Sequence, residues 1–330
     1  MTTKNLTRAE AAGFFLAHDN FTILTHRRPD GDTLGSAAAL CLGLRKLGKH
    51  AWVLNPTEPL DHLDWLLADI TKDFADSGDT IVAVDVAAPN MLPRDFEPLA
   101  VKTSLRIDHH GSCTPFAPEE LVDPDSASCA EIICDILTLL GVEMDADIAD
   151  ALYVGVATDT GCFRYANTNA HAFLVASVCA QAGADVSGLN LELFESHSLA
   201  KLRLHAWIAE NVKIFGDGEL ALVAIPKAVE ERLGVTDAEL GNLSSYARSI
   251  EGVCLAATLR QGKYGETKIS VRAVPGWDAA AVCEKFGGGG HPGAGGATSR
   301  LSLEETAKLL EEYMLEALRL PLRGAVSKAD

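Results

Sequence analysis

The sequence lacks any run of about 18 uncharged apolar residues, the length that a membrane-spanning helix needs. Its opening stretch, MTTKNLTRAEAAGFF, also lacks the basic-then-apolar pattern of a signal peptide, so we expect a cytoplasmic protein. Basic residues are few, with 28 Lys and Arg against 46 Asp and Glu and a formal net charge of -18. This balance disfavours a protein that coats long nucleic acid through a basic face.

Cysteine pairs with metal-binding or redox spacing are also missing. None of the eight cysteines forms a C-x-x-C motif, and most lie in apolar surroundings. We therefore expect the cysteines to be small buried residues of a protein in a reducing compartment. This interpretation excludes a zinc knuckle and a disulfide framework. The sequence contains no phosphate loop of the G-K-[ST] type, no internal repeat and no Gly/Ser linker.

The apolar content that is present suffices for two domains, because 48% of the 330 residues are hydrophobic. Residues 1–190 alternate strand-like and helix-like runs, the βαβ pattern of an α/β domain with a parallel, doubly wound sheet. Short apolar runs predict strands at 22–24, 51–54, 81–84 and 105–107. Helix-forming runs predict helices at 36–46, 130–140, 146–157 and 171–182.

The pattern changes after residue 190. Residues 191–212 predict a polar amphipathic helix that links two domains, and residues 213–330 predict a smaller α+β domain. In that domain, GVCLAATLRQ and TKISVRAV read as strands joined by a hairpin at 262–265. A helix at 303–320 precedes a tail at 323–330 that we expect to be frayed.

The first predicted strand ends in THRRPDGD, which places His26, Asp30 and Asp32 at its carboxyl end, the edge where open α/β sheets bind ligands. Two carboxylates this close raise each other's pKa unless a cation holds them, so a divalent metal is predicted. The alternative is that Asp30 and Asp32 only form a turn and cap the next helix. An EF-hand calcium loop is excluded, because Leu34 and Cys41 stand where oxygen ligands belong.

Further acids and histidines follow the later apolar elements. Asp85 ends IVAV, Asp108, His109 and His110 end SLRI, and Asp159 follows an apolar helix. Each alone could be a helix cap, a core histidine or a turn residue. Together they would be costly to bury unpaired at one sheet edge. Four Asp and two His suit two divalent ions about 3.5 to 4 Å apart, of the Mn²⁺ or Mg²⁺ kind, which favours phosphoester hydrolysis.

Near the C-terminus, KFGGGGHPGAGGAT puts four glycines before His291. Such a loop lets backbone N–H groups approach an anion and the imidazole adds a donor, although a flexible turn is the alternative. Arg272 on a nearby predicted strand is a natural phosphate partner, or simply a solvated side chain. Charge favours an anion site here, since residues 213–330 carry 14 Lys and Arg against 16 Asp and Glu, whereas residues 1–212 carry 14 against 30.

The motifs HRRPDGDTLGS, VDVA, RIDHHGS, ATDTGCFRYANT and FGGGGHPGAGGA, in this order, resemble the DHH phosphoesterase family over about residues 20–300. Within that family the chain is most similar to the stand-alone bacterial nano-RNases, the oligoribonuclease and pAp phosphatase type, which join a DHH domain to a DHH-associated domain. RecJ exonucleases carry extra domains, membrane-type cyclic-di-AMP phosphodiesterases add transmembrane segments, and yeast-type exopolyphosphatases lack the GGGH loop. One mild departure is Cys129 in SCAE, where the family has S-T-A-E.

The resemblance implies roles for individual residues. His26, Asp30 and Asp85 would hold one ion and Asp32, Asp85, His109 and Asp159 the other, with Asp85, and in one arrangement Asp159, bridging. Asp108 would orient a histidine ligand, His110 would act at the attacked phosphate, and Arg28 would grip the substrate beside the metals. The residues that would bind the terminal phosphate or nucleotide are Arg272, Gly288, Gly289, Gly290 and His291.

The activity implied by the resemblance is hydrolysis of RNA of two to about five nucleotides to nucleoside 5′-monophosphates, and removal of the 3′-phosphate of pAp. Two Mn²⁺ ions, or Mg²⁺ or Co²⁺, would act in a cleft between the domains, without a covalent enzyme intermediate. Long duplex nucleic acid and membranes would not be partners, and a homodimer fits the family. The alternatives are a phosphodiesterase for pApA or cyclic di-AMP, a nucleotide-binding regulator, and a module that binds tRNA ends.

Overall fold

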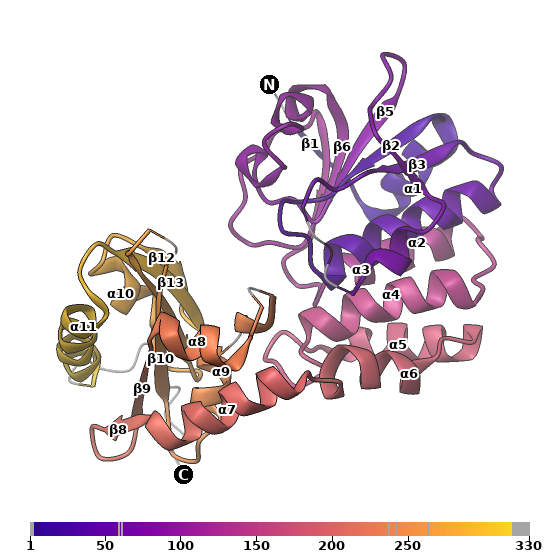
Figure 1. The fold of residues 1–330 in the computed structure, drawn as a ribbon. Helices are drawn as coiled ribbons and strands as arrows, with labels where there is room; N and C mark the ends of the chain where they lie inside the picture. The colour runs from indigo at the N-terminus through magenta and orange to yellow at the C-terminus, as the bar shows by residue number, and fades with distance from the viewer. Residues whose placement is uncertain are drawn as a thin grey trace, which may run out of the picture. The chain divides into compact units, whose positions relative to one another are not determined.

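The computed structural model describes residues 3–58, 60, 62–236, 238–241, 243–262 and 264–318. The chain divides into two compact units, Met1–Ser196 and His197–Asp330, each with its own sheet (Figure 1). The predicted α/β fold with a smaller α+β second domain is confirmed. The tail predicted to fray, 323–330, lies outside the described residues. Within the described ranges, no helix has the length and apolar character needed to cross a bilayer.

The described part of the first unit is built on a seven-stranded parallel sheet in the order β1-β7-β6-β5-β2-β3-β4. Its strands are β1 (Lys4–Asn5), β2 (Phe21–Leu24), β3 (Ala51–Leu54), β4 (Thr71–Lys72), β5 (Thr80–Val84), β6 (Thr103–Asp108) and β7 (Glu119–Val122). All four residues of β2 are buried, as expected for a parallel sheet covered on both faces. The strands predicted from apolar runs correspond to β2, β3, β5 and β6.

Helices of the first unit pack mainly on one face of this sheet, and short 3₁₀ turns and loops cover the other. The helices are α1 (Arg8–Ala17), α2 (Gly31–Lys46), α3 (Cys129–Leu139), α4 (Ala146–Asp159), α5 (Ala170–Ala182) and α6 (Val186–Asn190). The shorter turns are η1 (Asp64–Leu67), η2 (Pro89–Met91), η3 (Glu97–Lys102) and the π-type turn η4 (Leu191–Glu195). Helix α2 begins five residues before the predicted start, because Asp30 caps it through the amides of Asp32 and Thr33.

The second unit has a mixed sheet in the order β12-β13-β11-β10-β9-β8. Its strands are β8 (Lys213–Phe215), β9 (Leu220–Ile225), β10 (Leu255–Gln261), β11 (Thr267–Ala273), β12 (Gly289–His291) and β13 (Ala294–Ser299). Its helices are α7 (Leu199–Asn211), α8 (Lys227–Leu233), α9 (Leu243–Arg248), α10 (Ala279–Glu284) and α11 (Leu303–Ala317), with the turn η5 (Ala238–Leu240). Strands β10 and β11 pair antiparallel, as the predicted hairpin requires. Leu204 and Ile208 of α7 are buried in this unit's core.

Candidate metal centre

The predicted metal ligands gather at one edge of the first sheet. Strands β6, β5 and β2 are neighbours, and they are followed by His109, Asp85 and His26, respectively. The first turn of α2 brings Asp32 to the same place, and the last residue of α4 brings Asp159. Because parallel strands end together, residues far apart in the sequence meet here.

Two groups of donor atoms form this cluster, and a third set, Asp85, His109 and His110, overlaps both of them. The Nε2 atom of His26 lies 3.5 Å from Asp30 Oδ1 and 3.4 Å from Asp85 Oδ2. The Nε2 atom of His109 lies 3.5 Å from Asp85 Oδ1, 3.6 Å from Asp159 Oδ2 and 3.8 Å from Asp32 Oδ2. Within His26, Asp30 and Asp85, and within Asp32, His109 and Asp159, ligand atoms lie no more than 4.8 Å apart. Asp85 thus faces both groups, as the prediction of two ions requires.

Asp85 itself shows that a cation fits this place. Its Oδ1 atom is buried and has no hydrogen-bond partner among the described residues, which is costly for a carboxylate oxygen. Its backbone has a φ of 58°, a left-handed conformation that is uncommon for residues with a side chain. Strain and an orphaned oxygen at the centre of an acid and histidine cluster match a bridging ligand.

Both candidate histidine ligands are oriented by backbone carbonyls. The Nδ1 atom of His26 lies 2.9 Å from the carbonyl oxygen of Arg27, and that of His109 lies 3.4 Å from the carbonyl oxygen of Ser126. A carbonyl only accepts, so these contacts assign the proton to Nδ1. Each Nε2 atom therefore faces the carboxylates and is the ring nitrogen that would bind a metal ion.

Asp32 is held by the N-terminus of α3. Its Oδ2 accepts a hydrogen bond of 2.7 Å from the amide of Cys129, and its Oδ1 accepts one of 2.9 Å from the amide of Ala130. Helix α4 passes so close that a Cβ on Gly155 would lie 2.9 Å from Asp32 Oδ1. The SCAE stretch therefore contacts Asp32 through its backbone amides.

The electrostatics of the cluster show an excess of negative charge. Burial raises the pKa of Asp32, and the charges of Asp85 and Asp159 raise it further. Burial also raises the pKa of Asp85, against the opposing hydrogen bond from His26. Burial raises the pKa of Asp159 to about 6, although the charge of His109 opposes this shift. Acids crowded in this way favour a bound cation.

The negative charge of the cluster also acts on His26, where it favours the charged form of the side chain. Burial disfavours its charged form, but hydrogen bonds and charge interactions with Asp30 and Asp85 outweigh that cost and raise its pKa to about 11. Positive charge is therefore strongly favoured at the point where these three side chains meet. A divalent ion would supply that charge in place of a proton.

The predicted catalytic residues lie beside the cluster. His110 donates from Nδ1 to Asp108 Oδ1 at 2.7 Å, which leaves Nε2 on a side chain that is 32% exposed. Burial of Asp108 opposes its charge, but the hydrogen bonds and charge of His110 and the charge of Arg106 together outweigh burial and lower the pKa of Asp108. Arg28 is exposed in the loop before α2, with a φ of 54°. His110 is thus partly exposed and Arg28 exposed, in loops that adjoin the metal-ligand candidates His109 and His26 in the sequence.

Asn167 is a residue of the site that the motif analysis did not single out. Its Nδ2 donates to the carbonyl of Asp159 at 3.1 Å and to the carbonyl of Ala127 at 2.9 Å. These bonds fix the end of α4 against the turn before α3. The signal available in the sequence was its position in ATDTGCFRYANT, eight residues after Asp159.

In the second unit, the glycine stretch predicted as a loop is largely a strand. Gly289, Gly290 and His291 form β12, which pairs antiparallel with β13. Gly290 has a φ of 144°, and a Cβ there would lie 2.3 Å from the carbonyl oxygen of Ala294. Glycine is required at residue 290 because the backbones of β12 and β13 approach so closely. The prediction from the sequence instead explains these glycines by the binding of an anion to their backbone N–H groups. Gly288 precedes β12 and is equally crowded, by the carbonyl oxygen of Gly296 at 2.2 Å from its Cβ position.

Arg272 and His291 lie in one cross-strand row. Arg272 pairs with Ala294, and Ala294 pairs with His291. Directly opposed residues project from the same face of a sheet, so both side chains share one face with a small alanine between them. His291 is exposed, and Arg272 is partly buried with Nη1 donating to the carbonyl of Val271 at 3.1 Å.

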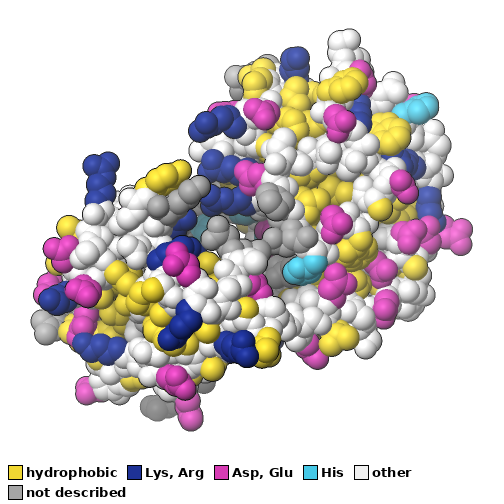
Figure 2. Space-filling model, viewed as in Figure 1, with side chains coloured by type: hydrophobic (Ala, Val, Ile, Leu, Met, Phe, Trp, Pro, Cys, Tyr) yellow, Lys and Arg dark blue, Asp and Glu magenta, His cyan; other side chains and the backbone are white. Residues whose placement is uncertain are grey.

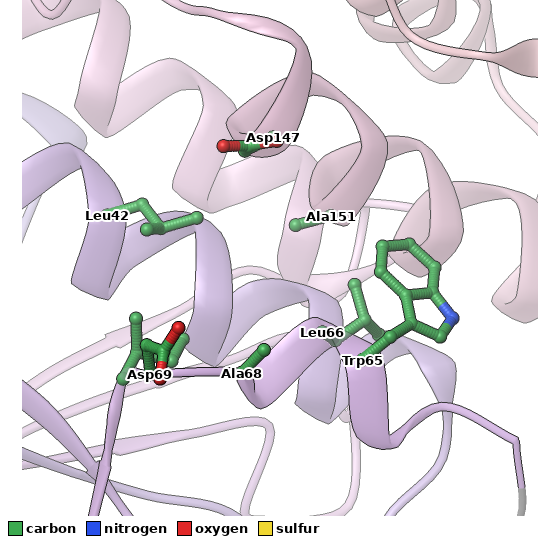
Figure 3. A pocket seen from close by; sticks show the side chains of 8 residues that line it. Leu42, Trp65, Leu66, Ala68, Asp69, Asp147 and Ala151 are labelled. Atoms are coloured by element: carbon green, nitrogen blue, oxygen red, sulfur yellow. The ribbon is translucent and has the colours of Figure 1, made fainter.

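A cavity of about 270 Å³ in the first unit is separate from this centre (Figure 3). Leu42 of α2, Trp65 and Leu66 of η1, and Asp147 and Ala151 of α4 contribute to its lining. None of the predicted site residues is among those that line it. We therefore assign the candidate active site to the cluster and not to this cavity.

Comparisons with known families define the class of protein. The DHH family, N-terminal domain, matches residues 20–156, and the DHHA1 domain matches residues 223–316. A Thermus thermophilus protein is 32% identical over 314 residues, which cover 92% of this chain and 90% of that protein. The chain therefore belongs to the DHH family of phosphoesterases, in the form that carries a DHHA1 domain.

Two similar proteins carry the same name. The Thermus thermophilus protein is named bifunctional oligoribonuclease and PAP phosphatase NrnA. A Bacillus subtilis protein of the same name is 28% identical over 299 residues, covering 88% of this chain and 93% of its own length.

Solved structures give the same architecture. An exopolyphosphatase-related protein from Bacteroides fragilis superposes with a TM-score of 0.86 and 25% identity, covering 95% of this chain and 98% of that one. RecJ from Thermus thermophilus in complex with Mn²⁺ superposes with a TM-score of 0.56 and 15% identity, covering 95% of this chain and 55% of RecJ. The RecJ likeness concerns the fold alone.

Proposed function

We propose that this chain is a metal-dependent phosphoesterase that hydrolyses RNA of two to about five nucleotides to nucleoside 5′-monophosphates and removes the 3′-phosphate of pAp. The observation that carries the proposal is the cluster of carboxylates and imidazoles around Asp85 Oδ1, a buried oxygen that accepts no hydrogen bond from the described residues. The names of the relatives, bifunctional oligoribonuclease and PAP phosphatase, supply the substrate class.

Two divalent ions, Mn²⁺ in our proposal, would polarise a phosphoryl oxygen and activate water when bound. His26 and Asp30 would hold one ion, Asp32, His109 and Asp159 the other, and Asp85 both. Asp108 keeps the Nδ1 proton of His110 in place, so that Nε2 is available to a substrate oxygen. Arg28, exposed beside the cluster, would hold a phosphate oxygen of the substrate.

The second unit would bind the far end of a short substrate. Arg272 and His291 share one sheet face and offer a guanidinium and an imidazole to a terminal phosphate or nucleotide. Figure 2 shows both acidic and basic side chains on the visible face of each unit, and the chain carries a formal net charge of -18. Affinity for long nucleic acid comes from extended basic surface, so this distribution favours substrates held at a few points.

The experiment that tests the proposal compares substrates of graded length. Protein stripped of metal and supplied with Mn²⁺ is given 5′-labelled RNA of two, three, five and twenty-four nucleotides, and separately pAp, pApA and cyclic di-AMP. We expect rapid cleavage of the shortest RNAs and dephosphorylation of pAp. Cleavage of pApA or cyclic di-AMP alone would refute the proposed substrate and support messenger turnover. No cleavage of any substrate would favour a nucleotide-binding regulator.

A further inference from the structure

A buried arginine contacts Asp108, the carboxylate that holds His110 beside the metal centre. Arg106 belongs to β6, two residues before Asp108, and its side chain is 0% exposed. In the sheet it pairs with Ala83 of β5 on one side and Glu120 of β7 on the other. A charged side chain is rarely buried completely unless it has partners that need it.

Two buried carboxylates are those partners. The Nη1 atom of Arg106 lies 3.2 Å from Asp108 Oδ2, and Nη2 lies 2.8 Å from Glu120 Oε2. The other oxygen of Asp108 accepts from the Nδ1 atom of His110 at 2.7 Å and from the amide of His109 at 2.9 Å. Asp108 therefore connects Arg106 on one side with both histidines of the DHH motif on the other.

Arg106 also holds the backbone that follows Asp85. Its Nη1 donates to the carbonyl of Val86 at 3.3 Å and to the carbonyl of Ala87 at 3.2 Å. Glu120, its second carboxylate partner, accepts from the amide of Phe116 at 2.9 Å through Oε1. One planar guanidinium thus joins the segment after β5, the DHH turn after β6 and the segment before β7.

We propose that Arg106 is a positioning residue of the reaction, which fixes Asp108 so that His110 is held in one orientation beside the metal cluster. The inference rests on the proposed function for the role of His110. Partners behind catalytic histidines and metal ligands fix ring orientation, and their loss typically costs about 10- to 100-fold in activity or metal affinity. Lysine keeps the charge but cannot reproduce the two-pronged geometry.

A double-mutant cycle tests this role. Arg106→Lys and His110→Ala are made separately and together, and kcat, KM and Mn²⁺ affinity by calorimetry are measured for each protein. We expect Arg106→Lys alone to lower kcat about 10- to 100-fold with little change in KM or Mn²⁺ affinity. In the His110→Ala background we expect less than about a threefold further loss, because the residue acts through His110.

Equal losses of kcat in both backgrounds would overturn the proposal, as would a variant that loses thermal stability but keeps wild-type kcat. Arg260→Lys is the matched control, because Arg260 pairs with buried Glu230 at 3.0 Å in the second unit. If Arg106→Lys does not fold, the double variant Arg106→Gln with Glu120→Gln takes its place in the cycle, because it removes one charge of each sign. We again expect a large loss of kcat in the wild-type background and a small further loss in the His110→Ala background.

The cycle is run on bis(p-nitrophenyl) phosphate as well as on pAp and an RNA dinucleotide. A wild-type protein that hydrolyses only the nitrophenyl ester would refute the proposed natural substrates while leaving the role of Arg106 open to measurement. A pattern of non-additivity on that ester would still support Arg106, and additivity would still refute it.

Discussion

The metal centre and the glycine hairpin, formed by β12 (Gly289–His291) and β13 (Ala294–Ser299), are built in opposite ways. At the metal centre the side chains are buried and already positioned, since Asp32 is 1% exposed and Asp85 is 2% exposed. Amides of α3, backbone carbonyls and the Asp108 carboxylate orient the groups that would meet a metal or a substrate. In the hairpin, His291 is exposed, and close contact between backbones is what positions it.

The free energy needed to assemble the two regions therefore differs. A buried cluster of like charges is expensive to assemble, so the protein places its supporting hydrogen bonds there. A pair formed by a partly buried arginine and an exposed histidine costs less to build, and it gains most of its order when an anion binds. We therefore expect changes at the first region to affect chemistry and metal affinity, and changes at the second to affect substrate binding.

The largest effect is expected from Asp85→Asn. The amide keeps the shape but removes the charge that serves both donor groups, so we expect kcat to fall by at least about 10³-fold at any Mn²⁺ concentration. Steady-state kinetics across a Mn²⁺ titration measures this. Asp95→Asn, an exposed acid of the same unit, is the control. Recovery of wild-type turnover at high Mn²⁺ would contradict the assignment of Asp85 to both ions.

Arg272→Ala tests the region around the glycine hairpin, where we expect a change in substrate binding. Loss of one charge-assisted hydrogen bond to phosphate should raise KM for pAp about 10- to 100-fold, with Mn²⁺ affinity unchanged. Kinetics and calorimetry on the same preparation separate the two quantities, and the exposed Arg300→Ala serves as the control. A parallel loss of Mn²⁺ binding would show that the two regions do not divide the work as proposed.

The same contrast explains what the sequence could predict. Continuous apolar runs such as 81–84 predict buried parallel strands, and acids or histidines that follow such runs predict a shared edge of the sheet. The strand nature of Gly289–His291 could not be predicted, because glycines carry no side-chain pattern. The partners of Arg106 were equally hidden, since its pairing with Glu120 joins strands that are adjacent only after folding. Asp30 shows that a cap and a candidate ligand can be one residue.

Asp159→Asn should have opposite effects with and without metal. The pKa of Asp159 is raised to about 6, so folding of chelated protein is penalised as pH rises from the unfolded value near 3.8 through 6. Above pH 6 we expect the variant to exceed wild type by about 1 to 2 kcal/mol in free energy of unfolding, with the gain vanishing below about pH 4. With Mn²⁺ present, the variant should bind the ion more weakly. Denaturant titrations at several pH values, with chelator or with Mn²⁺, decide both signs; destabilisation of the chelated variant would show that the cost of burying the Asp159 charge does not dominate.

The smallest effect is expected from Cys129→Thr. The amide of residue 129, not its side chain, holds Asp32, and a threonine hydroxyl can replace the thiol contact to the carbonyl of Ile107 at 3.6 Å. We therefore expect a change within about 1 kcal/mol in the free energy of unfolding and an unchanged Mn²⁺ affinity, measured by denaturant titration and calorimetry. Cys129→Pro is the matched contrast, because it removes the amide donor itself and should weaken Mn²⁺ binding. A tenfold loss of Mn²⁺ affinity in Cys129→Thr would mean that the buried side chain helps to shape the metal centre, and that the support of Asp32 is not a property of the backbone alone.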